Sequence, residues 1–287
     1  MSKLIEIKRR IKSTKNIKQI TKAMEMVSAV ELKKSQILLN INREYIETLK
    51  KTVKDLSSYL EDIQNIEDKN NLIIVITPHK GFVGPLILNL EKQVLSLINS
   101  NKEKKFKIIG IDKKALSFIF SLNIEVLSDL EISNHSDITE LYSITDLIVE
   151  EIKEKKIDSI YIIYTKFKNM MFNEIVTEKI LPIDIKEDEY SDAHYVKKEQ
   201  KDNPAIYDFE NNFEDIYIDT LKLYIPSIVQ SCIIESSTSE NAIRMLTMRN
   251  SSDNADELNK NLVFESNKIR QGSITQEVIE IASASNI

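Results

Sequence analysis

The chain begins MSKLIEIKRRIKSTKNIKQITKAMEMV (residues 1–27), and its first sixty residues contain no glycine or proline. Apolar residues recur there at helical spacing, and a later series steps by three and four like a coiled-coil seam. This pattern predicts one helix of about 90 Å at 1.5 Å per residue. A helix of that length must pack against another long helix. The two series are Leu4, Ile7, Ile11, Ile17, Ile20, Met24 and Val27, and then Ile46, Leu49, Val53, Leu56 and Leu60.

The last eighty residues supply the second long helix. Between residues 209 and 284 the only helix-breaking residues are Pro226 and Gly272. Pro226 either kinks this helix or marks a boundary near its start. The polar run from Glu235 to Asn241 is either a loop between two helices or a solvated stretch within one. The apolar stripe consists of Leu221, Ile225, Ile228, Cys232, Ala255, Leu258, Leu262, Ile269, Ile274, Val278 and Ile281.

The middle of the chain has a different period, because short β-branched runs alternate with amphipathic segments. This alternation indicates an α/β domain with an open, mostly parallel sheet. The sequence therefore predicts three segments: a coiled-coil helix at 1–62, a Rossmann-like α/β domain at 70–205 and a coiled-coil helix at 209–287. Residues 184–215 are expected to form an exposed acidic connector. Strands are expected at 72–77, 106–111, 124–127, 159–165 and 174–181, and helices at 86–99, 113–121 and 136–154.

Composition excludes several classes of protein. Hydrophobic residues make up 42% of the 287 residues and charged residues 29%, which is typical of a folded soluble protein. The single cysteine, Cys232, excludes an internal disulfide or a cysteine-built zinc site. No apolar run approaches the roughly 20 residues that span a bilayer. The N-terminus lacks the apolar core of a signal peptide, so we expect a cytoplasmic protein.

Charge is distributed unevenly along the chain. Residues 1–35 contain ten lysines and arginines but three glutamates, a net charge of +7, whereas the whole chain carries −6. A basic end on an acidic protein suggests an acidic partner: nucleic acid, anionic lipid or an acidic protein surface. A nucleic-acid-associated coiled coil is therefore an alternative function, although no aromatic residue interrupts the basic stripe.

The sequence predicts no catalytic, cofactor or metal site. The turn at residues 80–84, KGFVG, lies where phosphate-binding loops occur, but it matches neither a Walker loop nor a full G-x-G-x-x-G pattern. We interpret it as a tight strand-to-helix turn, and an enzyme built around it is the weakest alternative. His79, His135 and His194 have no partner at metal-ligand spacing.

Two terminal motifs resemble one family. Residues 9–29, RRIKSTKNIKQITKAMEMVSA, are similar to the N-terminal signature of the gamma subunit of F-type ATP synthases. The stretches ENAIRMLTMR (240–249), DNA (253–255) and NKIRQGSITQE (267–277) resemble the C-terminal part of the same family. The matches occur in the right order around an α/β segment of suitable size, so the resemblance covers essentially the whole chain. The turn differs, with His79 where the family usually has aspartate.

The resemblance implies a non-catalytic rotor subunit. In this family the terminal helices form an antiparallel coiled coil inside a ring of three alpha and three beta subunits. The α/β domain lies against the epsilon subunit and the membrane ring of c subunits. Proton flow turns the shaft and drives ATP synthesis on beta. The resemblance also implies a peripheral position on the cytoplasmic side of a bacterial inner membrane.

The family's partner-contacting positions are transferred residue by residue. Met24 matches a position near an acidic loop of beta, and Arg244 matches an arginine associated with the same contact. Arg270 and Gln271 match a pair that engages a beta loop as a catch. Thr275 and Glu277 match polar positions close by.

Overall fold

The computed structural model describes residues 2–57, 69–112, 118–119, 124–130, 139–183 and 213–284. The contacts divide the chain into two compact units. Residues 1–33, 82–84 and 241–287 form one unit, here the coiled-coil unit. Residues 34–81 and 85–240 form the other, here the sheet unit. Most of the predicted helix at 113–121, most of the acidic connector, His135 and His194 lie outside the described residues.

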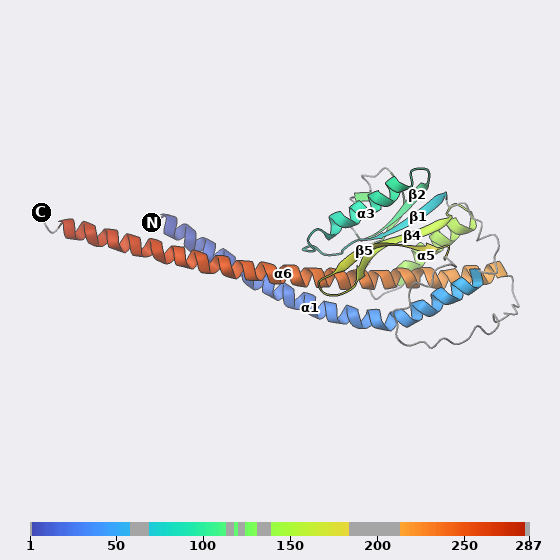
Figure 1. Ribbon diagram of the computed structural model, residues 1–287, viewed down its shortest axis with the longest axis horizontal. Helices are drawn as coiled ribbons and strands as arrows, with labels where there is room; N and C mark the ends of the chain where they lie inside the picture. Colours follow the sequence, from blue (N-terminus) through green and yellow to red (C-terminus); the bar gives the residue numbers. More distant parts are fainter. Residues whose placement is uncertain are drawn as a thin grey trace. The chain divides into compact units, whose positions relative to one another are not determined.

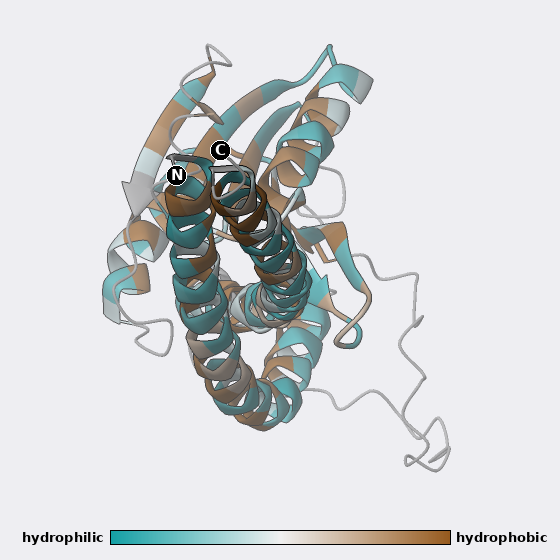
Figure 2. Cartoon of the chain, turned by 90° about the vertical axis from the view of Figure 1, so that its left-hand side faces the viewer, coloured by the Kyte–Doolittle hydropathy of each residue, from teal (hydrophilic) through white to brown (hydrophobic). Residues whose placement is uncertain are grey.

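Two helices account for most of the described chain. Helix α1 covers Ser2–Ser57 and α6 covers Phe213–Ala284. Each contributes residues to both units. The helix α6 continues through Pro226, so this proline is neither an end nor a start. Within the coiled-coil unit, α1 and α6 lie side by side and antiparallel (Figures 1 and 2).

The sheet unit contains five strands in the order β3-β2-β1-β4-β5. The first four strands in this order pair in parallel, and β5 pairs antiparallel with β4 at the edge. The predicted open, mostly parallel sheet is therefore confirmed. The bounds of the strands are β1 Asn70–Ile76, β2 Lys105–Ile111, β3 Glu125–Leu130, β4 Ser159–Phe167 and β5 Asn173–Leu181.

Helices cover both faces of the sheet. Helix α3 (Leu86–Ser100) lies on one face, and α5 (Thr139–Lys153) and α6 lie on the other (Figure 1). Alternate residues of β1 point to opposite faces because the strand period is two. Leu72, Ile74 and Ile76 join the core beneath α5 and α6. The central strand β1 is therefore buried on both sides, as its unbroken apolar run Leu72–Ile76 requires.

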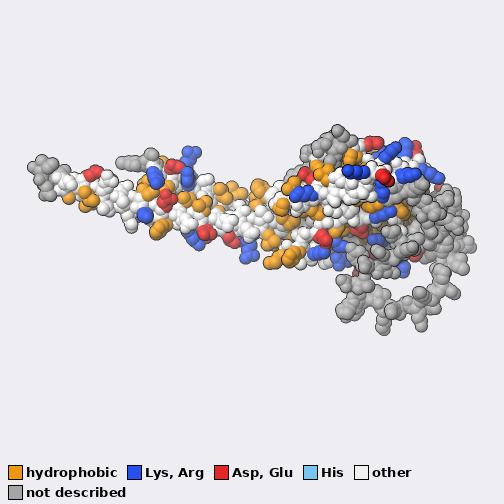
Figure 3. Space-filling model, turned by 45° about the horizontal axis from the view of Figure 1, so that its top comes forward, with side chains coloured by type: hydrophobic (Ala, Val, Ile, Leu, Met, Phe, Trp, Pro, Cys, Tyr) orange, Lys and Arg blue, Asp and Glu red, His pale blue; other side chains and the backbone are white. Residues whose placement is uncertain are grey.

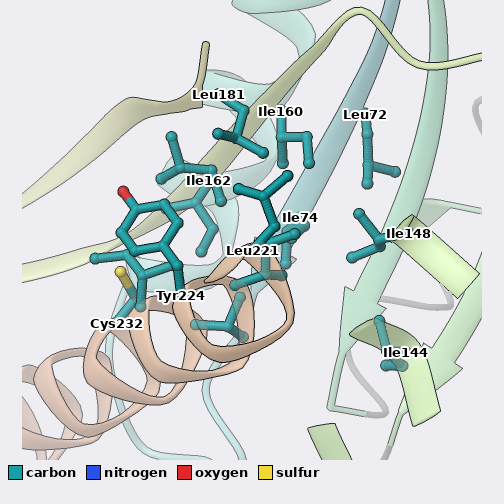
Figure 4. Packing of buried hydrophobic residues seen from close by; sticks show 14 of the residues in the cluster. Leu72, Ile74, Ile144, Ile148, Ile160, Ile162, Leu181, Leu221, Tyr224 and Cys232 are labelled. Atoms are coloured by element: carbon teal, nitrogen blue, oxygen red, sulfur yellow. The ribbon is translucent and has the colours of Figure 1, made fainter. Parts of the chain in front are cut away.

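The core between α6 and the sheet is apolar and tightly closed. Leu221, Tyr224 and Cys232 of α6 point towards Ile162 of β4 and Leu181 of β5 (Figure 4). Burial raises the pKa of the Cys232 thiol well above its ordinary value. Burial likewise raises the pKa of the nearby Tyr217 phenol to about 12. These side chains are held away from water by the same packing that fixes α6 on the sheet.

The polar run from Glu235 to Asn241 differs from both sequence-based alternatives. It is neither a loop nor a solvated stretch, because it is helical and most of its side chains are buried. Two of its hydroxyl groups donate hydrogen bonds within the chain. The Thr238 hydroxyl donates to the Ile234 carbonyl (2.8 Å), and the Ser239 hydroxyl donates to the Thr165 carbonyl of β4 (3.1 Å). Buried polar groups persist when they are paired in this way.

The packing of α6 on the sheet predicts a contrast between two leucines two positions apart. Leu221→Ala removes a fully buried side chain, so we expect it to lower the free energy of unfolding by about 2–5 kcal/mol. Leu223→Ala, at a side chain that is 53% exposed, is the matched control and should change it by less than about 0.5 kcal/mol. Urea denaturation of the full chain measures both. Equal losses would contradict this assignment of the buried face.

Candidate partner-contacting surface

The seam of the coiled-coil unit is built from small and polar residues. On α1 the buried positions repeat every seven residues, at Ile7, Thr14, Thr21 and Ser28, and Ser28 is only 1% exposed. On α6 they lie at intervals of four, three and seven, at Met248, Ser252, Ala255 and Leu262. A repeat of 3.5 residues is the coiled-coil period. Small side chains allow two helices to approach closely, but they bury little apolar area.

The outer surface of this unit carries the larger apolar side chains. On α1, large apolar side chains are 49–66% exposed, and lysines and arginines lie among them in the sequence. Hydrophobic and basic side chains are both visible along this surface (Figure 3). The expectation that Ile17, Ile20 and Val27 face the second helix is therefore wrong. Leu258 of α6 is also exposed rather than part of the seam. The exposed apolar residues of α1 in this unit are Ile5, Ile17, Ile20, Met26, Val27 and Val30.

One ion pair joins the two helices across the seam. The Lys18 ammonium donates a hydrogen bond to the Asp256 carboxylate. Lys260, one turn further along α6, contacts the other oxygen of the same carboxylate at 3.0 Å. The bonds from Lys18 and then Lys260 lower the pKa of the Asp256 carboxyl. A charged pair at a seam position fixes the register of two helices.

Met24 and Arg244, two of the residues predicted to contact beta, differ in how far they are buried. Met24 is half-buried on α1 and is followed by Glu25. Lys18 and Glu25 are also half-buried and fill the three–four spacing between the buried Thr14, Thr21 and Ser28, so we count them as seam positions. Arg244 is buried, and its guanidinium donates to the Asn241 side-chain oxygen at 2.9 Å on the same helix. The structure therefore shows Arg244 with a partner inside the chain. Its predicted contact with beta stays a prediction.

The four remaining predicted residues lie together near the end of α6. Arg270, Gln271, Thr275 and Glu277 are all exposed. Every described side chain from residue 270 to 283 is exposed, including the apolar Ile274, Val278, Ile279 and Ile281. Arg270 lies 26 residues beyond Arg244, which is about 39 Å along a helix. The two groups therefore cannot belong to one compact contact.

The glycine-containing turn after β1 has its backbone donors occupied. The carboxylate of Glu240, on α6, accepts hydrogen bonds from the backbone N–H groups of His79 (3.2 Å) and Lys80 (3.0 Å). Turns at this end of a parallel strand commonly present such donors to the phosphate of a ligand. In this chain the Glu240 carboxylate accepts the hydrogen bonds that such a phosphate would accept. Sequence reasoning missed Glu240, because its partners lie about 160 residues away.

The described residues contain no group of three or more metal-ligating side chains close enough to hold an ion. His79 faces an acid instead, since its ring Nδ1 lies 3.0 Å from Asp112 Oδ1. Among the helices of the described residues, none is long and apolar enough to cross a membrane.

The chain is similar to known proteins along nearly its full length. A family model described as ATP synthase matches residues 3–286. The ATP synthase gamma chain of Clostridium botulinum (strain Kyoto / Type A2) is 31% identical over 283 residues, which are 97% of this chain and 95% of the relative. The gamma chain of Roseiflexus sp. (strain RS-1) is 29% identical over 289 residues, with 97% and 96% covered.

Solved structures share the fold. A chain in the cryo-EM structure of the Euglena gracilis mitochondrial ATP synthase (OSCP/F1/c-ring, rotational state 3) superposes with a TM-score of 0.65 at 19% identity. The match covers 99% of this chain and 94% of that one. A chain of the Tetrahymena thermophila mitochondrial ATP synthase central stalk and c-ring gives a TM-score of 0.60 at 21% identity, covering 81% and 99%.

The Lys18–Asp256 pair predicts a defined pH dependence of stability. Because the folded-state pKa of Asp256 lies below its ordinary value of 3.8, the pair stabilises the fold above that pH. Its contribution is lost as the pH falls through the lower, folded-state value. We therefore expect Asp256→Asn to lower the melting temperature at neutral pH, and the difference from wild type to vanish in strong acid. The exposed Glu257→Gln is the control, and an equal drop in that variant would contradict a specific pair.

Proposed function

Because the chain belongs to the ATP synthase family as a gamma chain, a non-catalytic central-stalk subunit, we propose that it is the rotor shaft of an F-type enzyme. Its coiled-coil unit turns inside a ring of three alpha and three beta subunits. Ion flow through the c-subunit ring drives that rotation and thereby ATP synthesis on beta. The observation that carries this proposal is the 31% identity to a gamma chain over 97% of the chain.

The physical character of the coiled-coil unit supports an enclosed shaft. A two-helix unit that exposes isoleucine and valine while burying serine and threonine buries less apolar area than one with those side chains exchanged. A surrounding ring covers the exposed residues and supplies the missing burial. Contiguous exposed apolar surface of this kind marks a protein interface.

The asymmetry of the shaft supports a mechanism by population shift. As the shaft turns, each beta subunit meets a different face and is biased towards an open or a closed state. The basic residues of α1 around Met24 suit the acidic loop of beta that the family contact implies. Arg270, Gln271, Thr275 and Glu277 form a second, more distant contact near the end of α6. All six residues act by binding, and the chemistry of ATP takes place on beta.

The location follows from the complex. The chain is a peripheral component of the ATP synthase, held at the membrane through the epsilon subunit and the c-subunit ring. Its curated relatives include bacterial gamma chains. We propose the cytoplasmic side of a bacterial inner membrane.

Co-expression with the alpha and beta subunits of the same organism tests the assignment. We expect the chain to enter a large complex on size-exclusion chromatography and to raise steady-state ATP hydrolysis above that of alpha and beta alone. A chain that elutes by itself and leaves turnover unchanged would overturn the rotor assignment. Salt-sensitive binding to nucleic acid by that chain would then support the alternative function.

Met24→Lys tests the contact with beta. The variant adds a cation beside the acidic loop, and a new ion pair should hold the shaft at one position. We expect ATP hydrolysis to continue while ATP-driven proton pumping falls. Met24→Leu is the control, because it keeps an apolar side chain of similar volume and adds no charge. Unchanged pumping by Met24→Lys would remove Met24 from the proposed contact.

A further inference from the structure

We propose that Glu240 is a positioning residue that locks the α/β sheet onto α6, so that torque passes between that helix and the sheet without slip. This inference rests on the proposed rotor function and assigns a role to a residue outside the six partner contacts. The joint consists of Glu240 and its neighbour Ser239 on α6, and of the strand ends to which they bond.

Glu240 is buried, and its carboxylate accepts hydrogen bonds from the backbone. It is 5% exposed, and its two oxygens divide their bonds between adjacent amides, Oε2 to His79 and Oε1 to Lys80. Hydrogen bonds to an ionised acceptor are roughly twice as strong as neutral ones. Two bonds from one carboxylate also define an orientation, which a single bond does not.

The turn that Glu240 holds is itself fixed to the neighbouring strand. The backbone N–H and the hydroxyl of Thr77 both donate to the Ile111 carbonyl at the end of β2, at 3.2 and 3.1 Å. The His79 ring lies 3.0 Å from Asp112, the residue that follows β2 and is 2% exposed. The amides bonded to Glu240 therefore belong to a turn that is bound to the ends of both β1 and β2.

Ser239 extends the joint to a third strand. Its buried hydroxyl donates to the Thr165 carbonyl of β4 at 3.1 Å. In the sheet order, β2, β1 and β4 are consecutive neighbours. Two successive residues of α6 thus bond, directly or through one turn, to three adjacent parallel strands near their carboxyl ends.

A polar joint adds directional bonds to an apolar contact. Much of the contact between α6 and the sheet is apolar, through side chains such as Leu221 and Tyr224. Glu235 of α6 also bonds to β4, at the Phe167 backbone and the Tyr164 side chain. Hydrophobic attraction is non-directional, whereas a hydrogen bond weakens as its geometry departs from alignment. A shift of α6 along or around its axis therefore stretches the bonds of the buried Glu240 carboxylate, and breaking hydrogen bonds to a buried charged group is costly. We therefore attribute the buried carboxylate to the orientation of α6 on the sheet, which its hydrogen bonds define.

The variant Glu240→Gln tests the joint with little change in shape. In the isolated chain we expect the His79 and Lys80 amides to exchange with solvent about tenfold faster, which corresponds to roughly 1.4 kcal/mol. In membrane vesicles carrying the complete enzyme we expect ATP hydrolysis to persist and proton pumping per ATP hydrolysed to fall. Ser239→Ala should shift this ratio in the same direction. Asp219→Asn, at an exposed acid on the same helix, should match the wild type.

Each outcome decides between the inference and its premise. Faster amide exchange with an unchanged pumping ratio would show that the bonds form but carry no torque, and would overturn the inference alone. Unchanged exchange would show that Glu240 does not hold the turn. If Glu240→Gln lowers the melting temperature and fails to assemble, Ser239→Ala decides, and an unchanged ratio in that variant rejects the joint. A wild-type chain that does not couple hydrolysis to pumping would instead reject the rotor function.

Discussion

The seam between α1 and α6 constrains the rest of the coiled-coil unit. It is made of serine, threonine and alanine as much as of leucine and isoleucine, so the two helices approach closely while burying little apolar surface. The isoleucines and valines that would make a stronger seam face outward instead. This arrangement is poor for an isolated helical hairpin. It suits a shaft whose outer surface has to contact a surrounding partner, because the partner then covers the exposed apolar side chains and stabilises the unit.

The sheet unit follows the opposite rule. Its central strand β1 is almost continuously apolar, both faces of the sheet are covered by helices, and α6 packs there through large side chains. Where the carboxyl ends of β1, β2 and β4 meet α6, polar groups form the contact. In many open α/β sheets that edge binds an anionic ligand. In this chain a buried glutamate holds the corresponding amides, so the same geometry serves attachment rather than ligand binding.

The sequence was sufficient to predict the architecture, but not which faces of the long helices form the seam. Helix lengths and the strands of the middle segment follow from period and from the absence of breaking residues. The apolar stripe Ile17–Ile20–Met24–Val27 and the observed seam Lys18–Thr21–Glu25–Ser28 have the same spacing and differ by one residue. One residue is about 100° around a helix. Hydrophobicity alone selects the apolar stripe as the seam. A surrounding partner that covers the apolar stripe explains why the more polar stripe forms the seam instead.

The polar run on α6 could not be placed from sequence for a related reason. Seven consecutive residues without an aliphatic side chain are typical of exposed segments. The partners of Ser239 and Glu240 lie on β4 and in the turn after β1, 74 to 161 positions away. Burial of these polar residues is unfavourable until the sheet supplies their hydrogen-bond partners. A buried polar cluster therefore marks a place where the position of the helix matters more than the stability gained. In a rotor, the attachment of the helix to the sheet is such a place, because load is applied there in a fixed direction.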